Sequence, residues 1–265
     1  MTAKLPEMNS FRDGFNAVVF GSSGGIGDAF ARCLSHNNRC NYVNAVSRDN
    51  TFGFDITDEN AIVLLADELE KSFGTVDLIM DATGVLQIDG AGPEKSISSL
   101  DPEIMTKAFM ANTIGPALLI KHCARLLPVE TKGVFATLSA RVGSIEDNRL
   151  GGWYSYRASK AALNQIVKTA SIEVSRKRPN SVLLALHPGT VESRLSDPFA
   201  KGRFTHSAVE ASQRMLKVID QTNPDETGGF LIMRAKESLG DFLTLSKHSF
   251  PPKQLKLDKP PDFFV

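Results

Sequence analysis

Short apolar runs alternate with longer segments of helical periodicity along most of this chain, and this alternation restricts the fold more than any other feature. The runs that we interpret as strands are Asn16–Phe20, Tyr42–Val46, Asp77–Met80, Val134–Leu138, Val182–Leu186 and Phe230–Met233. The segments that we interpret as helices are Ala61–Phe73, Glu103–Leu126, Tyr156–Arg176 and Ala208–Gln221. Because strands that alternate with helices form parallel βαβ units, the pattern predicts an α/β fold with one doubly wound parallel sheet and helices on both faces.

The helical period is clearest in Tyr156–Arg176. Its apolar positions follow the spacing i, i+3, i+4, i+7 and i+11 and are Leu163, Ile166, Val167, Ala170 and Val174. This spacing places them on one face of a helix with 3.6 residues per turn. Ligands of a doubly wound sheet bind beyond the carboxyl ends of the strands, so we expect the functional residues in the loops that follow the strands.

Length and charge narrow the classes of protein. A chain of 265 residues is long enough for one large α/β domain over residues 1–265, with residues 1–15 as an N-terminal extension and residues 243–265 as an irregular tail. Formal net charge is zero, so bulk electrostatics provides no attraction to nucleic acid or to an anionic membrane. We therefore expect neither as a partner.

The cysteines and the N-terminus indicate a cytoplasmic protein. Cys33, Cys40 and Cys123 form no CxxC pair and no Cys/His set with zinc spacing, so we expect free thiols and no metal. Met1–Phe15 lacks the long apolar core of a signal peptide. No apolar run approaches the ~20 residues that span a bilayer.

A glycine-rich loop follows the first predicted strand. It contains Gly21, Ser23, Gly25 and Gly27, and a predicted helix opens at Asp28. Glycines let the backbone turn tightly and approach a pyrophosphate, whose charge is stabilised by N–H groups at the helix N-terminus. The loop also fits G-x-S-x-G, in which Ser23 would be a hydrolase nucleophile. That alternative is weaker, because a nucleophile elbow usually follows several strands and this loop follows the first.

A tyrosine and a lysine at spacing i, i+4 lie further along the chain. Tyr156 and Lys160 share one face of the predicted helix. A free tyrosine has a pKa near 10 and is a poor acid–base catalyst at neutral pH. An adjacent ammonium group and a positive nicotinamide ring stabilise the phenolate and lower that pKa. The pair thus suits a general acid that reduces a carbonyl, although an exposed Tyr–Lys helix pair is the commoner explanation for the spacing alone.

Taken together, Gly21-x3-Gly25-x-Gly27 and Tyr156-x3-Lys160 resemble the short-chain dehydrogenase/reductase family over roughly Ala17 to Ile232. The resemblance implies a Rossmann-type fold and an NAD(P)-dependent oxidoreductase. It implies that Asn112 orders a proton-relay water, that Tyr156 transfers the proton, and that Lys160 holds the ribose and tunes Tyr156. The cofactor-binding set that it implies is Gly21, Ser23, Gly25, Ile26, Gly27, Arg48, Asp55, Gly84, Tyr156, Lys160, Pro188, Gly189, Val191 and Ser193.

Within the family, the segment from Leu138 to Ser196 is similar to the C-factor-like, or sniffer-like, carbonyl reductases. The chain departs from the family pattern in several places. Phe20 replaces a threonine before the first glycine, and Ser193 replaces a threonine at the nicotinamide. Asp81 and Ala82 replace two asparagines, which we expect to weaken the bracing of the central strand.

The most consequential departure concerns the catalytic serine. Ala140 occupies its usual position, three residues before Gly143, and has no hydroxyl. Ser139 and Ser144 are the neighbouring hydroxyls, and we favour Ser139 as the catalytic residue because it stays closest to the family position. Ser139 would need a twist or bulge at the strand end to reach the pocket. His187 also lies at a strand end, and we interpret it as structural.

The leading hypothesis is hydride transfer between NADP(H) and a small carbonyl or alcohol. The second strand is followed by Ser47 and Arg48 where NAD-specific folds place an acidic residue, and Arg accommodates a 2′-phosphate, so we expect NADP(H), with NAD(H) as the alternative. A dinucleotide-binding signalling protein of the C-factor type, with little turnover, is the alternative function.

The sequence does not name the substrate. We expect specificity to lie in the polar, Gly-containing segment from Arg194 to Ser207, which could act as a lid. Trp153, Phe199 and Phe204 could either line a substrate pocket or simply pack in the core. In many relatives the helices corresponding to Glu103–Leu126 and Tyr156–Arg176 form a dimer face, so we expect a homo-oligomer.

Overall fold

The fold is an open twisted sheet with helices on both faces. A computed structural model describes residues 5–51, 54–193, 195, 199, 202, 204–233 and 242–244. Its strands are β1 Phe15–Phe20, β2 Cys40–Val46, β3 Leu78–Asp81, β4 Gly133–Leu138, β5 Ser181–His187, β6 Gly229–Met233 and β7 Phe242–Thr244. The strand order is β2-β1-β3-β4-β5-β6-β7. Strands β1 to β6 pair in parallel and β7 pairs antiparallel to β6, which confirms the predicted doubly wound parallel sheet.

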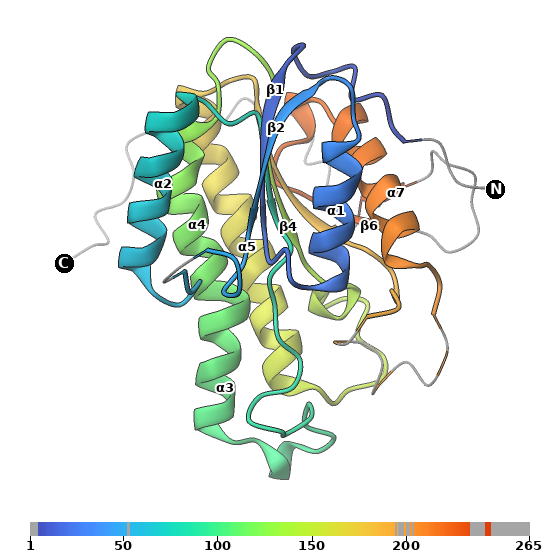
Figure 1. Cartoon of the computed structure of the whole chain (residues 1–265). Coiled ribbons are helices and arrows are strands. Elements are labelled where there is room, and N and C mark those ends of the chain that lie inside the picture. Colours follow the sequence, from blue (N-terminus) through green and yellow to red (C-terminus); the bar gives the residue numbers. More distant parts are fainter. Residues whose placement is uncertain are drawn as a thin grey trace, which may run out of the picture.

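Helices cover the sheet in two layers. Their bounds are α1 Gly25–Ser35, α2 Glu59–Phe73, α3 Pro102–Phe109, α4 Gly115–Cys123, α5 Tyr154–Lys177 and α7 Ala208–Gln221. Helices α2, α4 and α5 lie on one side of the sheet, and α1 and α7 lie on the other (Figure 1). Each layer has its own apolar core, because side chains of a strand alternate between the two faces. Within the part of the chain that the structure describes, no helix is long and apolar enough to cross a membrane.

The predicted helix over residues 103–126 is interrupted in the structure. Helix α3 passes into a single π-helical turn, Met110–Ile114, before α4 continues the same direction (Figure 1). A π turn inserts one extra residue into the helix and often marks a functional position. Asn112, the residue implied to order a relay water, lies in this turn and is fully buried.

The predicted N-terminal extension contributes to the core. Met8 and Phe11 are buried in the same apolar cluster as side chains of α7. Ser10 donates to the Asp220 carboxylate through both its backbone N–H and its hydroxyl, each at 2.8 Å. At the other end, the first two residues of the predicted tail, Leu243 and Thr244, belong to β7, and the rest of that tail lies outside the described residues.

Candidate active site

A pocket of about 410 Å³ opens at the carboxyl ends of the strands, where the sheet topology places ligands. It brings together the start of α1, the residues after β4, the start of α5 and the loop after β5. Its lining residues are Ile26, Leu86, Ser139, Ala140, Arg141, Val142, Trp153, Tyr156, His187, Pro188, Gly189, Thr190, Val191, Ser193, Leu195 and Phe199. The residues implied to bind nicotinamide therefore share one cavity with Tyr156.

The glycine loop between β1 and α1 is held by very close backbone packing. Gly21 has φ +80°, and a Cβ there would lie 2.9 Å from the backbone of Ala82. A Cβ on Gly27 would lie 2.2 Å from the carbonyl oxygen of Gly21. A Cβ on Gly25, by contrast, would meet nothing closer than Ser193 Cβ at 3.6 Å. Gly21 and Gly27 thus close the turn, and Gly25 leaves its outer side open beside the loop after β5.

Helix α1 begins at Gly25, three residues earlier than the predicted start at Asp28. The residue before the helix is Gly24, which has no side chain that could cap the first turn. The N–H groups of that turn are therefore suited to an anion. Ser23 lies exposed in the same loop, and its φ is not positive, so it lacks the strained backbone of a nucleophile elbow.

The end of β2 carries a contact that sequence reasoning missed. The side-chain amide of Asn50 donates to the Ala45 carbonyl at 2.9 Å and to the Ser22 hydroxyl at 3.4 Å. Its oxygen accepts from the backbone N–H of Ser47 at 2.7 Å. Asn50 thereby ties the glycine loop to the end of the second strand. An asparagine shortly after a strand was the available signal, because Asn often bonds nearby backbone in turns.

Arg48 and Asp55 lie at this same edge. The Arg48 side chain is exposed just after β2. The Asp55 carboxylate accepts hydrogen bonds from the backbone N–H and the hydroxyl of Thr57, both at 2.8 Å. These bonds, with a smaller contribution from Arg48, hold the pKa of Asp55 below its ordinary value. Asp55 therefore has a structural role in the turn before α2, and its implied contact with the cofactor remains a prediction.

Tyr156 and Lys160 both lie in the first turns of α5. Tyr156 is part of the pocket wall, whereas Lys160 is buried and its Nζ donates to the carbonyl oxygen of Leu138 at 2.9 Å. A Cβ added to Gly84 would lie 3.5 Å from Lys160 Nζ and 3.2 Å from Asn112 Oδ1. Gly84 is thus the point where Lys160 and Asn112 converge. The structure brings these predicted residues together.

The Asn112 side chain is held by both of its polar ends. Its Oδ1 accepts from the backbone N–H of Val85 at 2.8 Å, and its Nδ2 donates to the Val85 carbonyl at 2.9 Å. The side chain therefore reaches from the π turn to the loop after β3. Its role in a proton relay stays a prediction.

Burial has the largest effect on the pKa values of Tyr156 and Lys160. It raises the pKa of Tyr156 to about 12. It also lowers the pKa of Lys160 to about 8, against an opposing effect of the Asp81 charge. Both shifts follow from the cost of a charge in a poorly solvated environment. The lower tyrosine pKa expected from the Tyr–Lys pair also depends on a positive nicotinamide ring, so it stays a prediction.

Asp81 corrects the expectation of a weakened central strand. Its carboxylate accepts from the Thr137 hydroxyl of the neighbouring strand β4 at 2.6 Å. It also accepts from the backbone N–H of Thr83 at 3.0 Å and from the Thr83 hydroxyl at 2.5 Å. An aspartate at this position therefore still braces β3 against β4. Burial raises the pKa of Asp81 despite these bonds.

The structure separates the two candidate serines. Strand β4 ends at Leu138, so Ser139 lies beyond the regular alternation and reaches the pocket without a bulge. The Ser139 hydroxyl donates to Asn164 Oδ1 of α5 at 2.6 Å. The Ser144 hydroxyl instead accepts from the backbone N–H of Asp147 at 3.3 Å and is outside the pocket lining. Ala140 lines the pocket with its methyl group.

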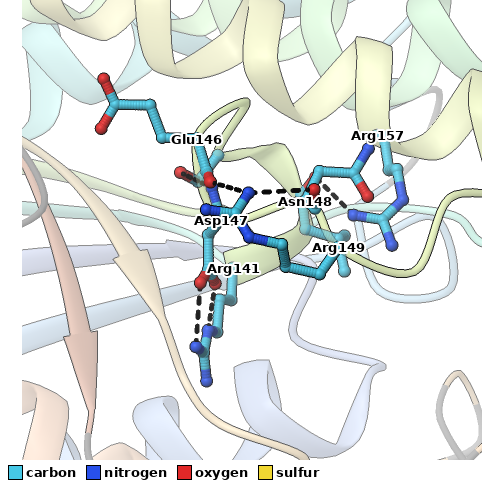
Figure 2. A network of polar contacts seen from close by, with 8 residues as sticks. Arg141, Glu146, Asp147, Asn148, Arg149 and Arg157 are labelled. Atoms are coloured by element: carbon cyan, nitrogen blue, oxygen red, sulfur yellow. Dashed lines mark hydrogen bonds and ion pairs between the residues drawn. The ribbon is translucent and has the colours of Figure 1, made fainter.

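Figure 2 shows why the loop between β4 and α5 keeps its shape. Arg141 forms a two-point ion pair with Asp147, with Nη2 to Oδ1 at 3.1 Å. Arg149 donates to the carbonyl oxygen of Glu146 at 2.6 Å, and Arg157 donates to that of Val142 at 3.4 Å. The loop is thus fixed at both ends, and the Arg141 guanidinium beside the pocket already has a carboxylate partner.

The loop after β5 is tied to a later segment. Gly189 has φ +81°, and a Cβ there would lie 2.8 Å from the Thr205 hydroxyl. The Thr205 backbone N–H donates to the Thr190 carbonyl at 2.8 Å, and Val191 forms a parallel bridge with His206. These contacts hold Pro188, Gly189 and Val191 against the pocket, and their binding of the cofactor stays a prediction. Ser193, at the end of the loop, lies next to Gly25.

His187 and Trp153 both contribute to the pocket wall. His187, interpreted from the sequence as structural, lines the cavity, and burial followed by the Arg141 charge lowers its pKa to about 4. Trp153 and Phe199 line the cavity too, with ring centroids 5.7 Å apart, which answers the open question for these two. Phe204 is outside the lining. Much of the predicted lid, Arg194–Ser207, lies outside the described residues.

Comparison with known proteins identifies the family of this chain. Residues 29–238 match the family model described as enoyl-(acyl carrier protein) reductase. The chain is 33% identical over 178 residues to 1-hydroxy-2-glutathionyl-2-methyl-3-butene dehydrogenase of Rhodococcus sp. (strain AD45), covering 67% of this chain and 74% of that protein. It is 33% identical over 168 residues to C-signal of Myxococcus xanthus, covering 62% of this chain and 92% of that protein.

Solved structures share the fold. NADPH-bound carbonyl reductase from chicken fatty liver superposes with a TM-score of 0.71 at 23% identity, covering 83% of this chain and 96% of that one. Carbonyl reductase Sniffer of D. melanogaster gives 0.72 at 18% identity, with 83% and 97% covered. The identity to C-signal confirms the expected likeness to the C-factor-like branch, and Sniffer shares the fold. A family model that spans most of the chain, and a relative at one-third identity, show that the chain belongs to the short-chain dehydrogenase/reductase family of NAD(P)-dependent oxidoreductases.

Proposed function

We propose that this protein transfers hydride between NADP(H) and a small carbonyl or alcohol, with Tyr156 as general acid and base. One observation carries the proposal. Tyr156 shares a single cavity with Ile26 of the glycine loop and with the loop from Pro188 to Ser193. A proton donor therefore faces the place where two predicted cofactor-binding loops meet.

The residues present fit a dinucleotide. The open side of Gly25 leaves room for a phosphate at the start of α1, where N–H groups favour an anion. Exposed Arg48 after β2 would pair with a 2′-phosphate, which favours NADP(H) over NAD(H). The chicken carbonyl reductase, which shares this fold, is described with NADPH bound.

In the proposed reaction this chain moves and holds protons. Reduction requires the Tyr156 hydroxyl to give its proton to the substrate oxygen as hydride reaches the carbon, and oxidation reverses both transfers. When bound, nicotinamide would supply or accept the hydride, and its oxidised form would carry a positive charge that favours the phenolate. Lowering the pKa of Tyr156 from about 12 to about 8 requires ~5 kcal/mol of differential stabilisation. Lys160 supplies part of that, and with three donors it can keep the Leu138 bond and still hold a ribose hydroxyl.

Asn112 and Ser139 complete the proposed machinery. Asn112 lies beside Lys160 at Gly84, where an ordered water could connect the two and return protons to Tyr156. Ser139 is the proposed hydrogen-bond donor to the substrate oxygen, and Asn164 holds its hydroxyl in the pocket meanwhile. Ser139 can therefore donate to the substrate only after its hydroxyl hydrogen has rotated away from Asn164 Oδ1.

The pocket favours an uncharged, largely apolar substrate. Apart from the loop from Pro188 to Ser193, the pocket wall includes Leu86, Val142, Trp153 and Phe199. Among the described lining residues Arg141 is the one with a guanidinium, and it is paired with Asp147. Burying an additional unpaired charge against this wall would be costly.

The test is turnover of aldehydes, ketones and diketones by the whole protein with NADPH, in wild type and in Tyr156→Phe. Tyr156→Phe keeps the ring but lacks the proton, so kcat should fall by at least ~10²-fold while NADPH affinity stays near that of the wild type. Tyr154→Phe is the matched control: it removes a hydroxyl two residues away in the same helix, outside the pocket lining. Near-normal turnover by Tyr156→Phe would refute the mechanism. NADPH binding without turnover of any substrate would favour the signalling alternative. The cytoplasmic location and the homo-oligomer stay predictions.

A further inference from the structure

Helix α5 begins without a cap of its own. The residue before its first turn is Trp153, which adopts a left-handed conformation, φ +56° and ψ +42°, and offers no side-chain cap. A helix start leaves several N–H groups without helical partners, and Ser, Thr, Asp or Asn usually accept from them. The helix that carries Tyr156 and Lys160 therefore depends on another segment for this contact.

Glu94, from the loop after β3, supplies the missing cap. Its Oε2 accepts from the backbone N–H of Ser155 at 3.2 Å, and its Oε1 accepts from the Ser155 hydroxyl. Glu94 is only 7% exposed. A carboxylate in this place satisfies the second N–H of the helix and complements the positive end of its dipole.

The backbone of Glu94 also holds Trp153, the residue before Tyr154. Its carbonyl oxygen accepts from the backbone N–H of Trp153 at 2.5 Å. Gly152, with φ +66°, passes so close that a Cβ would lie 3.4 Å from the same oxygen. Side chain and backbone of one residue thus hold both ends of the short segment from Trp153 to Ser155.

This segment determines where two pocket groups stand. Ser155 directly precedes Tyr156, and the rings of Trp153 and Tyr156 meet edge to face with centroids 6.2 Å apart. Trp153 also meets Phe199 at 5.7 Å. A shift of the segment would move the proton donor and the pocket wall together.

We propose that Glu94 is a positioning residue, whose buried carboxylate sets the location of Tyr156 and Trp153 at the start of α5. The expected loss of kcat rests on the proposed role of Tyr156. The expected displacement of Trp153 does not. Removing the carboxylate leaves the Ser155 N–H buried and without its acceptor, which a folded protein relieves by moving the segment.

Trp153 is the single tryptophan of the chain, so its fluorescence reports on this segment alone. In Glu94→Ala we expect a red-shifted Trp153 emission and a faster anisotropy decay in protein whose circular dichroism still shows a folded α/β domain. We expect kcat to fall at least ~10-fold, since small misplacements of catalytic groups are costly, while KM for NADPH stays within about 2-fold. Glu94→Gln keeps an acceptor of the same shape and should restore most of both readouts.

Asp101→Ala is the matched control. Asp101 is the N-cap residue of α3, where it accepts from the backbone N–H groups of Glu103 at 2.8 Å and Ile104 at 3.0 Å, and it is outside the pocket lining. It should lower stability as Glu94→Ala does and leave Trp153 emission and kcat unchanged. If Glu94→Ala does not fold, Ser155→Ala takes its place, with a smaller emission shift of the same sign expected.

The outcomes separate the two proposals. Unchanged Trp153 emission and unchanged kcat per folded molecule in Glu94→Ala would overturn the positioning role, even if Tyr156→Phe is inactive. A shifted emission in Glu94→Ala together with full turnover in Tyr156→Phe would instead overturn the role of Tyr156 and leave the structural part of the Glu94 proposal standing.

Discussion

Gly25→Ala and Gly27→Ala should differ in their effect on stability, although the two glycines lie in the same turn of α1. At Gly27 the new methyl carbon would lie 2.2 Å from the Gly21 carbonyl oxygen, well inside the 3.0 Å that real Cβ atoms keep. The loop and the helix must therefore separate. A methyl carbon at Gly25 would lie 3.6 Å from the nearest atom, so the protein without cofactor accommodates it without movement.

The magnitudes follow from these contacts. Overpacking typically costs ~1–3 kcal/mol, so Gly27→Ala should lower the free energy of unfolding by about that amount and the Tm by roughly 2–12 °C. Gly25→Ala should leave the Tm measured without cofactor within about 2 °C of the wild-type value. It should nevertheless weaken NADPH binding by ~10–100-fold, because a charge-assisted hydrogen bond to phosphate is worth ~1.5–3 kcal/mol.

Thermal unfolding without cofactor and NADPH titration by fluorescence provide both measurements on the same samples. Gly27→Ala should lose stability and affinity together, and Gly25→Ala should lose affinity alone. Wild-type affinity in Gly25→Ala would refute the idea that a phosphate approaches the backbone there. A wild-type Tm in Gly27→Ala would show that the close contact with Gly21 is not a constraint.

Three further predictions concern other parts of the site. Arg48→Ala should weaken NADPH binding at least ~10-fold and leave NADH binding unchanged, and equal losses for both cofactors would contradict the 2′-phosphate contact. Ser139→Ala should lower kcat/KM at least ~100-fold and Ser144→Ala should not, and a large loss confined to Ser144→Ala would reverse the assignment. Between pH 8 and 10.5 the unfolding free energy of the wild type should rise relative to that of Lys160→Met. Burial lowers the pKa of Lys160 to about 8, so the folded protein releases this proton before the unfolded chain does; denaturant titrations over this range that stay parallel would contradict it.

The sequence predicts the sheet well because its strands are short, apolar and punctuated by turns. All of the strands β1 to β6 overlap their predicted ranges, and Ala208–Gln221 has the bounds of α7. The π turn at Met110–Ile114 was not predicted, because a single extra residue leaves the apolar pattern of a long helix almost unchanged. The start of α1 was placed late, since glycines obscure a helix signal.

The residues of the candidate site also fall into two groups, those that the sequence could indicate and those that it could not. Residues in local motifs, such as Gly25 and Tyr156, could be proposed from their spacing together with the family resemblance. Glu94 and Asn164 could not, because each acts on a helix start or a strand end that is distant in sequence, and nothing local marks that contact. The proton affinity of Tyr156 was also beyond reach, because it depends on how deeply the phenol is buried.

The contact between the start of the chain and α7 determines when the core can close. Ser10 bonds to Asp220, 210 residues later, and Lys132 joins them by donating to the Ser10 hydroxyl and the Asp220 carbonyl. A ribosome that adds ~5–20 residues per second needs roughly 10–40 s between those two positions. Throughout that interval the nascent chain presents Met8 and Phe11 without the helix that covers them, so this end of the molecule is a natural place for a chaperone to bind.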